Sequence, residues 1–257
     1  MTTGIRVMDR GANRVLEYGL RAVRDPDLVP DFVRALPACT DGSIAAFDAD
    51  GTLWTDDVAD DFTTWMIGRG EVPGDGWAEY MRIYRDDPPA GCRHLLTLYE
   101  GKDIGVVRER VEHWWLHHAK RRWILEVVEA LHHVARKGYG LWIVSGTPTD
   151  FLLPLERMFG VERIVGMDFE LEDGIVTGRH AGISCAGQGK AEKLLQLAGG
   201  RRVALCCGNG SLDGPMMEIA GQAWSVYPDP AFEAFSHARG WPVLRRPSGF
   251  VEEEKFL

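Results

Sequence analysis

Residues 43–54, SIAAFDADGTLW, join a short apolar run to an acidic exit. The run Ser43–Phe47 has the length and uniform apolar character of a strand buried in a parallel sheet that helices cover on both faces. Asp48 and Asp50 follow it at once. Ligands of open α/β sheets bind at the carboxyl ends of the strands. The stretch therefore predicts both an α/β fold and the edge of the sheet that carries the functional site.

Four more short apolar runs along the chain predict the rest of this sheet. They are Gly140–Val144, Arg163–Met167, Val203–Cys207 and Ala223–Tyr227. Amphipathic stretches between the runs predict helices over residues 104–118, 124–135 and 189–198. Asp173 and Gly174, flanked by apolar residues, predict a hairpin turn. We therefore expect a Rossmann-like parallel sheet flanked by helices.

About 90 residues separate the first predicted strand from the second, far more than a crossover between parallel strands needs. Because this gap is rich in Trp, Tyr and helical periodicity, it predicts an inserted, mainly helical subdomain, or cap. Its aromatic residues are expected to form a small helical core, and the alternative is that they line a ligand site. The expected division is an N-terminal helical extension over 1–40, an α/β core over 41–58 and 137–257, and the cap over 59–136.

Composition excludes several classes of protein. The 257 residues are 45% hydrophobic and 26% charged, as in ordinary globular proteins. With 29 basic and 38 acidic residues the net charge is −9, which argues against nucleic-acid binding. No apolar run is long enough for a membrane span, and the first residues lack the apolar stretch of a signal peptide. The five cysteines lack a zinc-knuckle spacing, so we expect reduced thiols and a cytoplasmic protein.

Polar or small residues follow three of the predicted strands, and a lysine begins the helix that precedes the third of these strands. In chain order these residues are Asp48, Asp50, Ser145, Gly146, Lys190, Asn209 and Asp213. Carboxylates held at one place repel each other, so a cation must compensate them, and oxygen ligands of this type suit Mg²⁺. A hydroxyl, loop N–H groups and a lysine offer donors and positive charge to phosphate oxygens. The set predicts phosphoryl transfer.

At these residues the chain resembles the haloacid dehalogenase superfamily. Four ordered motifs carry the resemblance: residues 47–53 (FDADGTL), residues 144–146 (VSG), Lys190, and residues 208–213 (GNGSLD). The chain is most similar to the phosphoserine-phosphatase-like branch, which carries a helical cap between the first two motifs. Residues 173–178 are similar to the hairpin that precedes the lysine in that branch. The resemblance implies a small phosphomonoester as the substrate.

It also implies a role for each matched residue. Asp48 would be the nucleophile that forms an aspartyl-phosphate, and Asp50 would protonate the leaving group and then activate water. The remaining roles would be phosphate binding by Ser145, Gly146 and Lys190, and Mg²⁺ binding by Asp48, the Asp50 backbone carbonyl, Asn209 and Asp213.

Two further residues are candidates for contacts with the substrate. Asp57 stands nine positions after the nucleophile, where phosphoserine-specific relatives carry an acidic residue that faces an ammonium group. Arg93 matches the cap arginine that pairs with the substrate carboxylate in those relatives. The pair would suit a phosphorylated amino acid. The alternative is a cationic head group among the cap aromatics, as in a phosphorylated amino alcohol or choline.

Asn209 departs from the family pattern, which usually has Asp at that place. A neutral amide oxygen can still bind Mg²⁺, but the site loses one negative charge, so we expect weaker metal binding. Three function classes remain. The leading one is a Mg²⁺-dependent phosphatase; the others are a phosphotransferase with an alcohol as acceptor and a catalytically weakened phosphate-binding regulatory protein.

Overall fold

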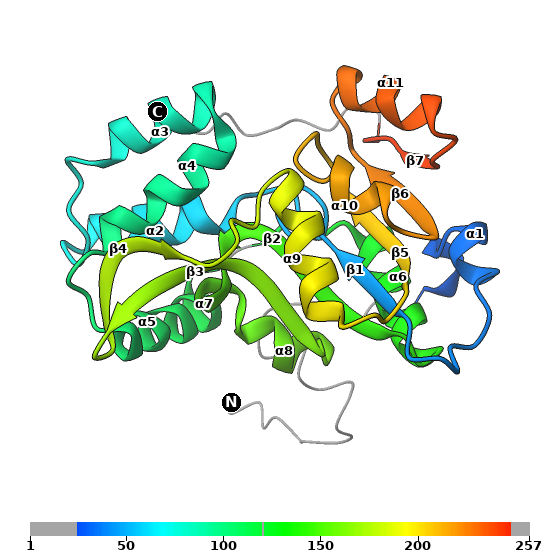
Figure 1. Cartoon of the computed structure of the whole chain (residues 1–257), viewed down its shortest axis with the longest axis horizontal. Coiled ribbons are helices and arrows are strands. Elements are labelled where there is room, and N and C mark those ends of the chain that lie inside the picture. Colours follow the sequence, from blue (N-terminus) through cyan, green and yellow to red (C-terminus); the bar gives the residue numbers. More distant parts are fainter. Residues whose placement is uncertain (1–24, 120, 248–257) are drawn as a thin grey trace, which may run out of the picture.

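In the computed structural model, which describes residues 25–119 and 121–247, a seven-stranded sheet crosses the molecule (Figure 1). The strand order is β4-β3-β2-β1-β5-β6-β7. The strands are β1 (Ile44–Phe47), β2 (Gly140–Pro148), β3 (Arg163–Glu172), β4 (Ile175–Ala181), β5 (Val203–Gly208), β6 (Gln222–Val226) and β7 (Val243–Leu244). Neighbouring strands are parallel except β3 and β4, which form an antiparallel hairpin.

β1 lies at the centre of the sheet, paired with β2 on one side and β5 on the other. All four residues of β1 and all six of β5 are buried, because helices cover both faces of the sheet. The central position brings the carboxyl ends of β1, β2 and β5 to one edge. The motifs that follow these three strands therefore meet there, as the sequence predicts.

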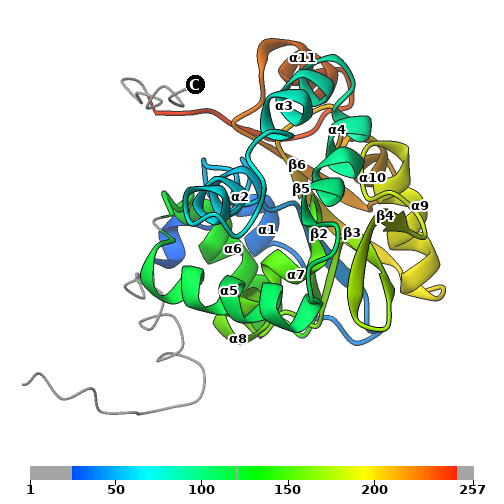
Figure 2. The ribbon, with the colours of Figure 1, turned by 90° about the vertical axis from the view of Figure 1, so that its left-hand side faces the viewer.

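Helices connect the strands. They are α1 (Asp31–Arg34), α2 (Val58–Gly68), α3 (Trp77–Asp86), α4 (Pro88–Leu95), α5 (Ile104–His117), α6 (Leu125–Arg136), α7 (Thr149–Leu152), α8 (Pro154–Phe159), α9 (Gln188–Ala198), α10 (Gly214–Glu218) and α11 (Pro230–Ala238), with short 3₁₀ turns at Pro26–Leu28 and Leu96–Tyr99. α9 and α10 lie on one face of the sheet, and α1 and α6 on the other (Figure 2). None of the described helices is long and apolar enough to cross a membrane.

The chain between β1 and β2 is helical, as predicted. α3 and α4 pack tightly against each other at one end of the molecule (Figure 1). A side chain at Gly91 of α4 would come within 2.4 Å of the Cα of Tyr84 in α3, so glycine permits this close approach. α6, the last helix of the insertion, packs against α1 and β2. The limits of the core and cap remain predictions.

The predicted fold class is confirmed, and each of the five apolar runs forms a strand of the sheet. The hairpin is confirmed as well: Asp173 and Gly174 have φ of 51° and 83°, which a tight two-residue turn requires. β7 was not predicted, because its two residues are too few to show a periodic pattern. Residues 1–24 of the predicted N-terminal extension lie outside the described residues.

Candidate active site

The loops after β1, β2 and β5 surround a cavity of about 380 Å³, over which α3 and α4 contribute side chains. Every residue predicted for catalysis, phosphate binding or metal binding lines this cavity, and so does Asp57. The topology therefore brings residues that lie up to 165 positions apart, from Asp48 to Asp213, to one place. Arg93 is not among the lining residues.

A buried ion triad forms the floor of the cavity. Lys190, in the first turn of α9, places its Nζ 2.7 Å from Oδ1 of Asp48 and 2.6 Å from Oδ1 of Asp213. All three residues are buried: Asp48 is 4% exposed, Lys190 is 3% exposed and Asp213 is 2% exposed. Thr52 donates a hydrogen bond of 2.8 Å to the other oxygen of Asp48. The carboxylate of Asp48 is thus held in one orientation.

With both carboxylates ionised, the triad holds two negative charges and one positive charge. Burial and the charge of Asp213 raise the pKa of Asp48 to about 7, although Lys190 opposes the shift. Burial also lowers the pKa of Lys190, but Asp213 and Asp48 outweigh it, so the net effect leaves that pKa above its ordinary value. Lys190 is therefore charged and cannot neutralise both carboxylates. A divalent cation would supply the missing positive charge.

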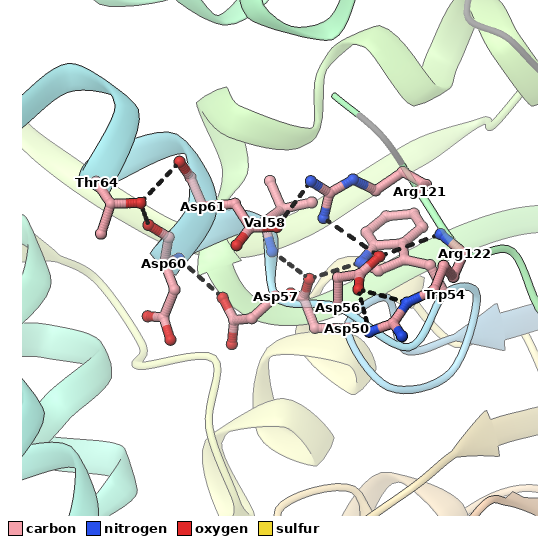
Figure 3. A network of polar contacts seen from close by, with 10 residues as sticks. All are labelled: Asp50, Trp54, Asp56, Asp57, Val58, Asp60, Asp61, Thr64, Arg121 and Arg122. Carbon is pink, nitrogen blue, oxygen red and sulfur yellow. Dashed lines mark hydrogen bonds and ion pairs between the residues drawn. The ribbon is translucent and has the colours of Figure 1, made fainter. Parts of the chain in front are cut away.

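Asp50 is oriented by three donors. Its Oδ1 accepts hydrogen bonds from Nε1 of Trp54 at 2.8 Å and from the backbone N–H of Val58 at 2.7 Å (Figure 3). Its Oδ2 accepts from Oγ1 of Thr147 at 2.6 Å. These donors come from the loop after β1, the start of α2 and the end of β2. They hold the carboxylate firmly between two motifs.

Sequence reasoning missed Trp54 and Thr147. The only local signal for Trp54 is an indole four residues after Asp50, and for Thr147 a hydroxyl two residues after Ser145. Ser145 itself is buried, and its Oγ accepts a hydrogen bond of 3.1 Å from the backbone N–H of Thr147.

The first and fourth motifs are in direct contact. Gly51 has a φ of +75°, and a Cβ there would lie 2.1 Å from Nδ2 of Asn209, so the contact requires glycine. Asp213 holds the fourth motif together, because its Oδ2 accepts the backbone N–H groups of Asn209 at 2.9 Å and Gly210 at 3.1 Å. The amide of Asn209 therefore lies beside the backbone that follows Asp50.

The predicted donor set fits a hard cation by its chemistry. The described residues contain no group of three or more His, Cys, Asp or Glu side chains arranged to hold a metal ion. The predicted metal ligands do not require three such side chains, because they combine the carboxylates of Asp48 and Asp213 with neutral oxygens from Asn209 and the Asp50 backbone. The surplus negative charge of the buried triad is the observation that favours a cation there.

Residues outside the triad also line the cavity. Asp57 lines it and caps α2, accepting a hydrogen bond of 2.9 Å from the backbone N–H of Asp60. Tyr80 and Tyr84 of α3 also line it, so these two aromatic residues of the insertion do more than fill a helical core. Arg93 lies on α4, but its side chain is exposed. The structure therefore does not bring Arg93 to the cavity with Asp57.

Comparisons with known proteins agree with this geometry. The family model of haloacid dehalogenase-like hydrolases matches residues 45–218. A probable phosphatase of Mycobacterium tuberculosis (strain ATCC 25618 / H37Rv) is 29% identical over 194 residues, which are 71% of this chain and 66% of the relative. A phosphoserine phosphatase of the same strain is 30% identical over 110 residues, 41% of this chain and 36% of the relative. The chain thus spans less than two thirds of the length of these relatives.

Solved structures share the fold. A protein of unknown function from Bordetella pertussis Tohama I superposes with a TM-score of 0.71 at 22% identity, over 80% of this chain and 99% of that one. A substrate-bound phosphoserine phosphatase superposes with a TM-score of 0.58 at 16% identity, over 79% of this chain and 93% of the other.

Proposed function

The chain belongs to the family of haloacid dehalogenase-like hydrolases, and from this premise we propose that it is a Mg²⁺-dependent phosphatase that acts on a small phosphomonoester. The observation that carries the proposal is the buried triad of Asp48, Lys190 and Asp213 beside the oriented carboxylate of Asp50. Phosphatases among the sequence relatives support it.

In the first step, an oxygen of Asp48 attacks phosphorus while the ester P–O bond breaks. The leaving oxygen takes a proton from Asp50, and an aspartyl-phosphate remains on Asp48. In the second step, Asp50 accepts a proton from water as that water attacks phosphorus. The bond between phosphorus and the oxygen of Asp48 breaks, inorganic phosphate leaves, and both carboxyl groups return to their starting forms.

The surrounding residues bind and orient. Lys190 and Thr52 hold the nucleophilic carboxylate of Asp48 in place. The Oγ of Ser145, the N–H of Gly146 and the charge of Lys190 would bind the equatorial phosphate oxygens. Mg²⁺, held by Asp48, the Asp50 carbonyl, Asn209 and Asp213, would when bound keep Asp48 ionised and offset the phosphate charge.

For the substrate we propose an amine-bearing metabolite that is either phosphoserine-like or an amino alcohol. Asp57 supports the amine, because its carboxylate lines the same cavity as Tyr80 and Tyr84. Arg93 does not supply a partner for a substrate carboxylate in this structure, because it is exposed and does not line the cavity. The five cysteines are all free thiols, which supports the reducing cytoplasm as the location.

The proposal is tested by measuring release of inorganic phosphate from an aryl phosphate, with Mg²⁺ and after chelation. We expect Mg²⁺-dependent release. A phosphotransferase would instead pass phosphate to added alcohols, and product analysis would show the new esters. The regulatory alternative, which Asn209 favours, predicts binding of phosphate without release. A panel of phosphorylated metabolites then identifies the substrate.

Asn209→Asp is expected to strengthen Mg²⁺ binding. Asp is nearly isosteric with Asn, so it fits against Gly51, and it adds a negative charge beside the metal ligands. We expect the apparent Mg²⁺ affinity to rise about tenfold in a thermal-shift titration. Activity at saturating Mg²⁺ should hold or improve. An unchanged affinity would show that residue 209 is not a ligand.

A further inference from the structure

Residues 121–124, which lie between α5 and α6, form hydrogen bonds with the acidic loop after β1. The backbone N–H of Thr55 donates to the carbonyl of Arg122 at 3.1 Å, and the N–H of Ile124 donates to the carbonyl of Leu53 at 2.9 Å. Residues 48–61 contain six Asp and no Lys or Arg, so positive charge must come from elsewhere in the chain. Arg121 and Arg122, which we call the arginine clamp, provide it (Figure 3).

Arg121 is the buried half of the clamp. Its side chain is 4% exposed, and Nη2 lies 2.8 Å from Oδ2 of Asp61 in the first turn of α2. Its Nη1 lies 4.0 Å from Oδ2 of Asp56, and its guanidinium lies over the ring of Trp114 in α5. The single side chain thus ties α5, the loop and α2 together.

Arg122 is the more exposed half and binds Asp56. Its Nη2 and Nε lie 3.0 and 3.2 Å from Oδ1 of Asp56, and its backbone N–H donates to Oδ2 at 3.1 Å. Three donors on one carboxylate hold the loop at this residue.

The clamp holds the loop between the two donors to Oδ1 of Asp50, at Asp56, and again after the second donor, at Asp61. Trp54 precedes Asp56, and Val58 lies between Asp56 and Asp61. If the loop shifts, both hydrogen bonds to Oδ1 of Asp50 change together. A displacement of about 1 Å at a reacting group can lower a rate about 10²-fold.

We propose that Arg121 and Arg122 are positioning residues that fix the Asp50 carboxyl group for proton transfer to the leaving oxygen. The inference rests on the proposed function. Arg121 is buried but the side chain of Asp61 is 40% exposed, so the pair contributes little net stability: desolvation of the guanidinium offsets an attraction that solvent already weakens. Among the described residues, Nε and Nη1 of Arg121 have no hydrogen-bond partner, so the pair is far from an optimal stabilising contact. What the geometry provides is a fixed loop.

The test compares two esters that differ in their need for an acid. A nitrophenyl phosphate has a leaving group that departs without a proton, whereas an alkyl phosphate needs one from Asp50. We expect Arg121→Met to lower kcat/KM for the alkyl ester by about 10- to 100-fold and that for the nitrophenyl ester by less than about threefold. kcat/KM is the right quantity, because it reports the step in which the ester bond breaks.

A second arginine, which is half-exposed, provides a control for the loss of a guanidinium contact elsewhere. Arg108 also joins α5 to the core, with Nε 2.6 Å from Oδ1 of Asp150 in α7, but it does not touch the loop after β1. Arg108→Met should leave the ratio of the two kcat/KM values unchanged. Trp54→Phe, which removes one donor to Asp50 directly, should change the ratio in the same direction as Arg121→Met. The double variant should lose less than the product of the two losses.

Folding is checked by thermal unfolding of each variant. If Arg121→Met does not fold, Asp61→Asn removes the partner of Arg121 instead and should give the same change in ratio. Equal losses for both esters would overturn the positioning role and leave the proposed function standing. Absence of Mg²⁺-dependent hydrolysis of the nitrophenyl ester by the unaltered chain would overturn the proposed function itself.

Discussion

Asp48→Asn abolishes phosphate release, with an expected loss of about 10⁴-fold or more. An amide cannot attack phosphorus, and no other carboxylate that lines the cavity occupies the same position against Lys190 and Thr52. The fold should persist, because Asn has nearly the same shape and Lys190 keeps Asp213 as its partner. Phosphate release in the presence of Mg²⁺ measures the loss, and thermal unfolding verifies the fold.

Asp50→Asn is the comparison within the same motif. If Asp50 acts only as acid and base, its loss should cost about 10²–10⁴-fold, less than the loss of the nucleophile. Trapping with acid should still detect phosphate bound to the protein in this variant but none in Asp48→Asn. Substantial turnover by a folded Asp48→Asn protein would remove Asp48 from the role of nucleophile.

Lys190→Met is expected to produce the largest loss of stability, about 3–5 kcal/mol at pH 8 without Mg²⁺. The substitution leaves Asp48 and Asp213 buried with no positive partner between them. Activity should be lost as well, because the phosphate loses its positive charge partner. Urea unfolding gives the free energy of unfolding, and a phosphate assay gives the activity.

The loss of stability should depend on pH. The pKa of Asp48 is already raised from 3.8 to about 7, and removal of Lys190, which lowers it, raises it further. The folded protein then holds a proton that the unfolded chain has released between these values, so its stability falls as the pH rises through that interval. We expect the deficit of Lys190→Met to be at least about 1 kcal/mol smaller at pH 5 than at pH 8.

Lys193→Met is the matched control on the same helix. Lys193 is also buried, and its Nζ donates to the carbonyl of Gly166 at 2.6 Å and pairs with Asp168. The side chain of Asp168 is 41% exposed, so loss of the lysine does not strand a buried charge. We expect a cost of about 1–2 kcal/mol with little dependence on pH. Equal, pH-independent losses in both variants would contradict the expectation that removal of Lys190 leaves buried carboxylate charge without a partner.

Local patterns were enough to predict the sheet and to locate the motifs. The apolar runs at β1 and β5 and the turn at Asp173-Gly174 depend on residues that are neighbours in the chain, and the structure confirms them. The edge that carries the site followed from the rule that ligands of α/β proteins bind at the carboxyl ends of the strands, whereas the order of the strands came from the structure. β7 shows the limit, because two residues carry no pattern.

The direction of individual side chains was not predictable in the same way. Cys92 and Arg93 are neighbours on α4, yet Cys92 lines the cavity and Arg93 is exposed. Which of them faces the site depends on the rotation of α4 about its axis. That rotation is set by packing against α3, where Gly91 meets Tyr84, and a spacing in the sequence does not show it.

The sequence by itself determined the fold class, the edge of the sheet that carries the site, and the identity of residues such as Asp48, Asp50 and Lys190 that line it. These depend on periodicity and on motif order, which are properties of the chain alone. Only the tertiary structure decided what holds Asp50 in place. Arg121 lies 60 residues from Asp61, and such a contact forms because the insertion folds back onto the loop after β1, not because either residue stands in a recognisable pattern.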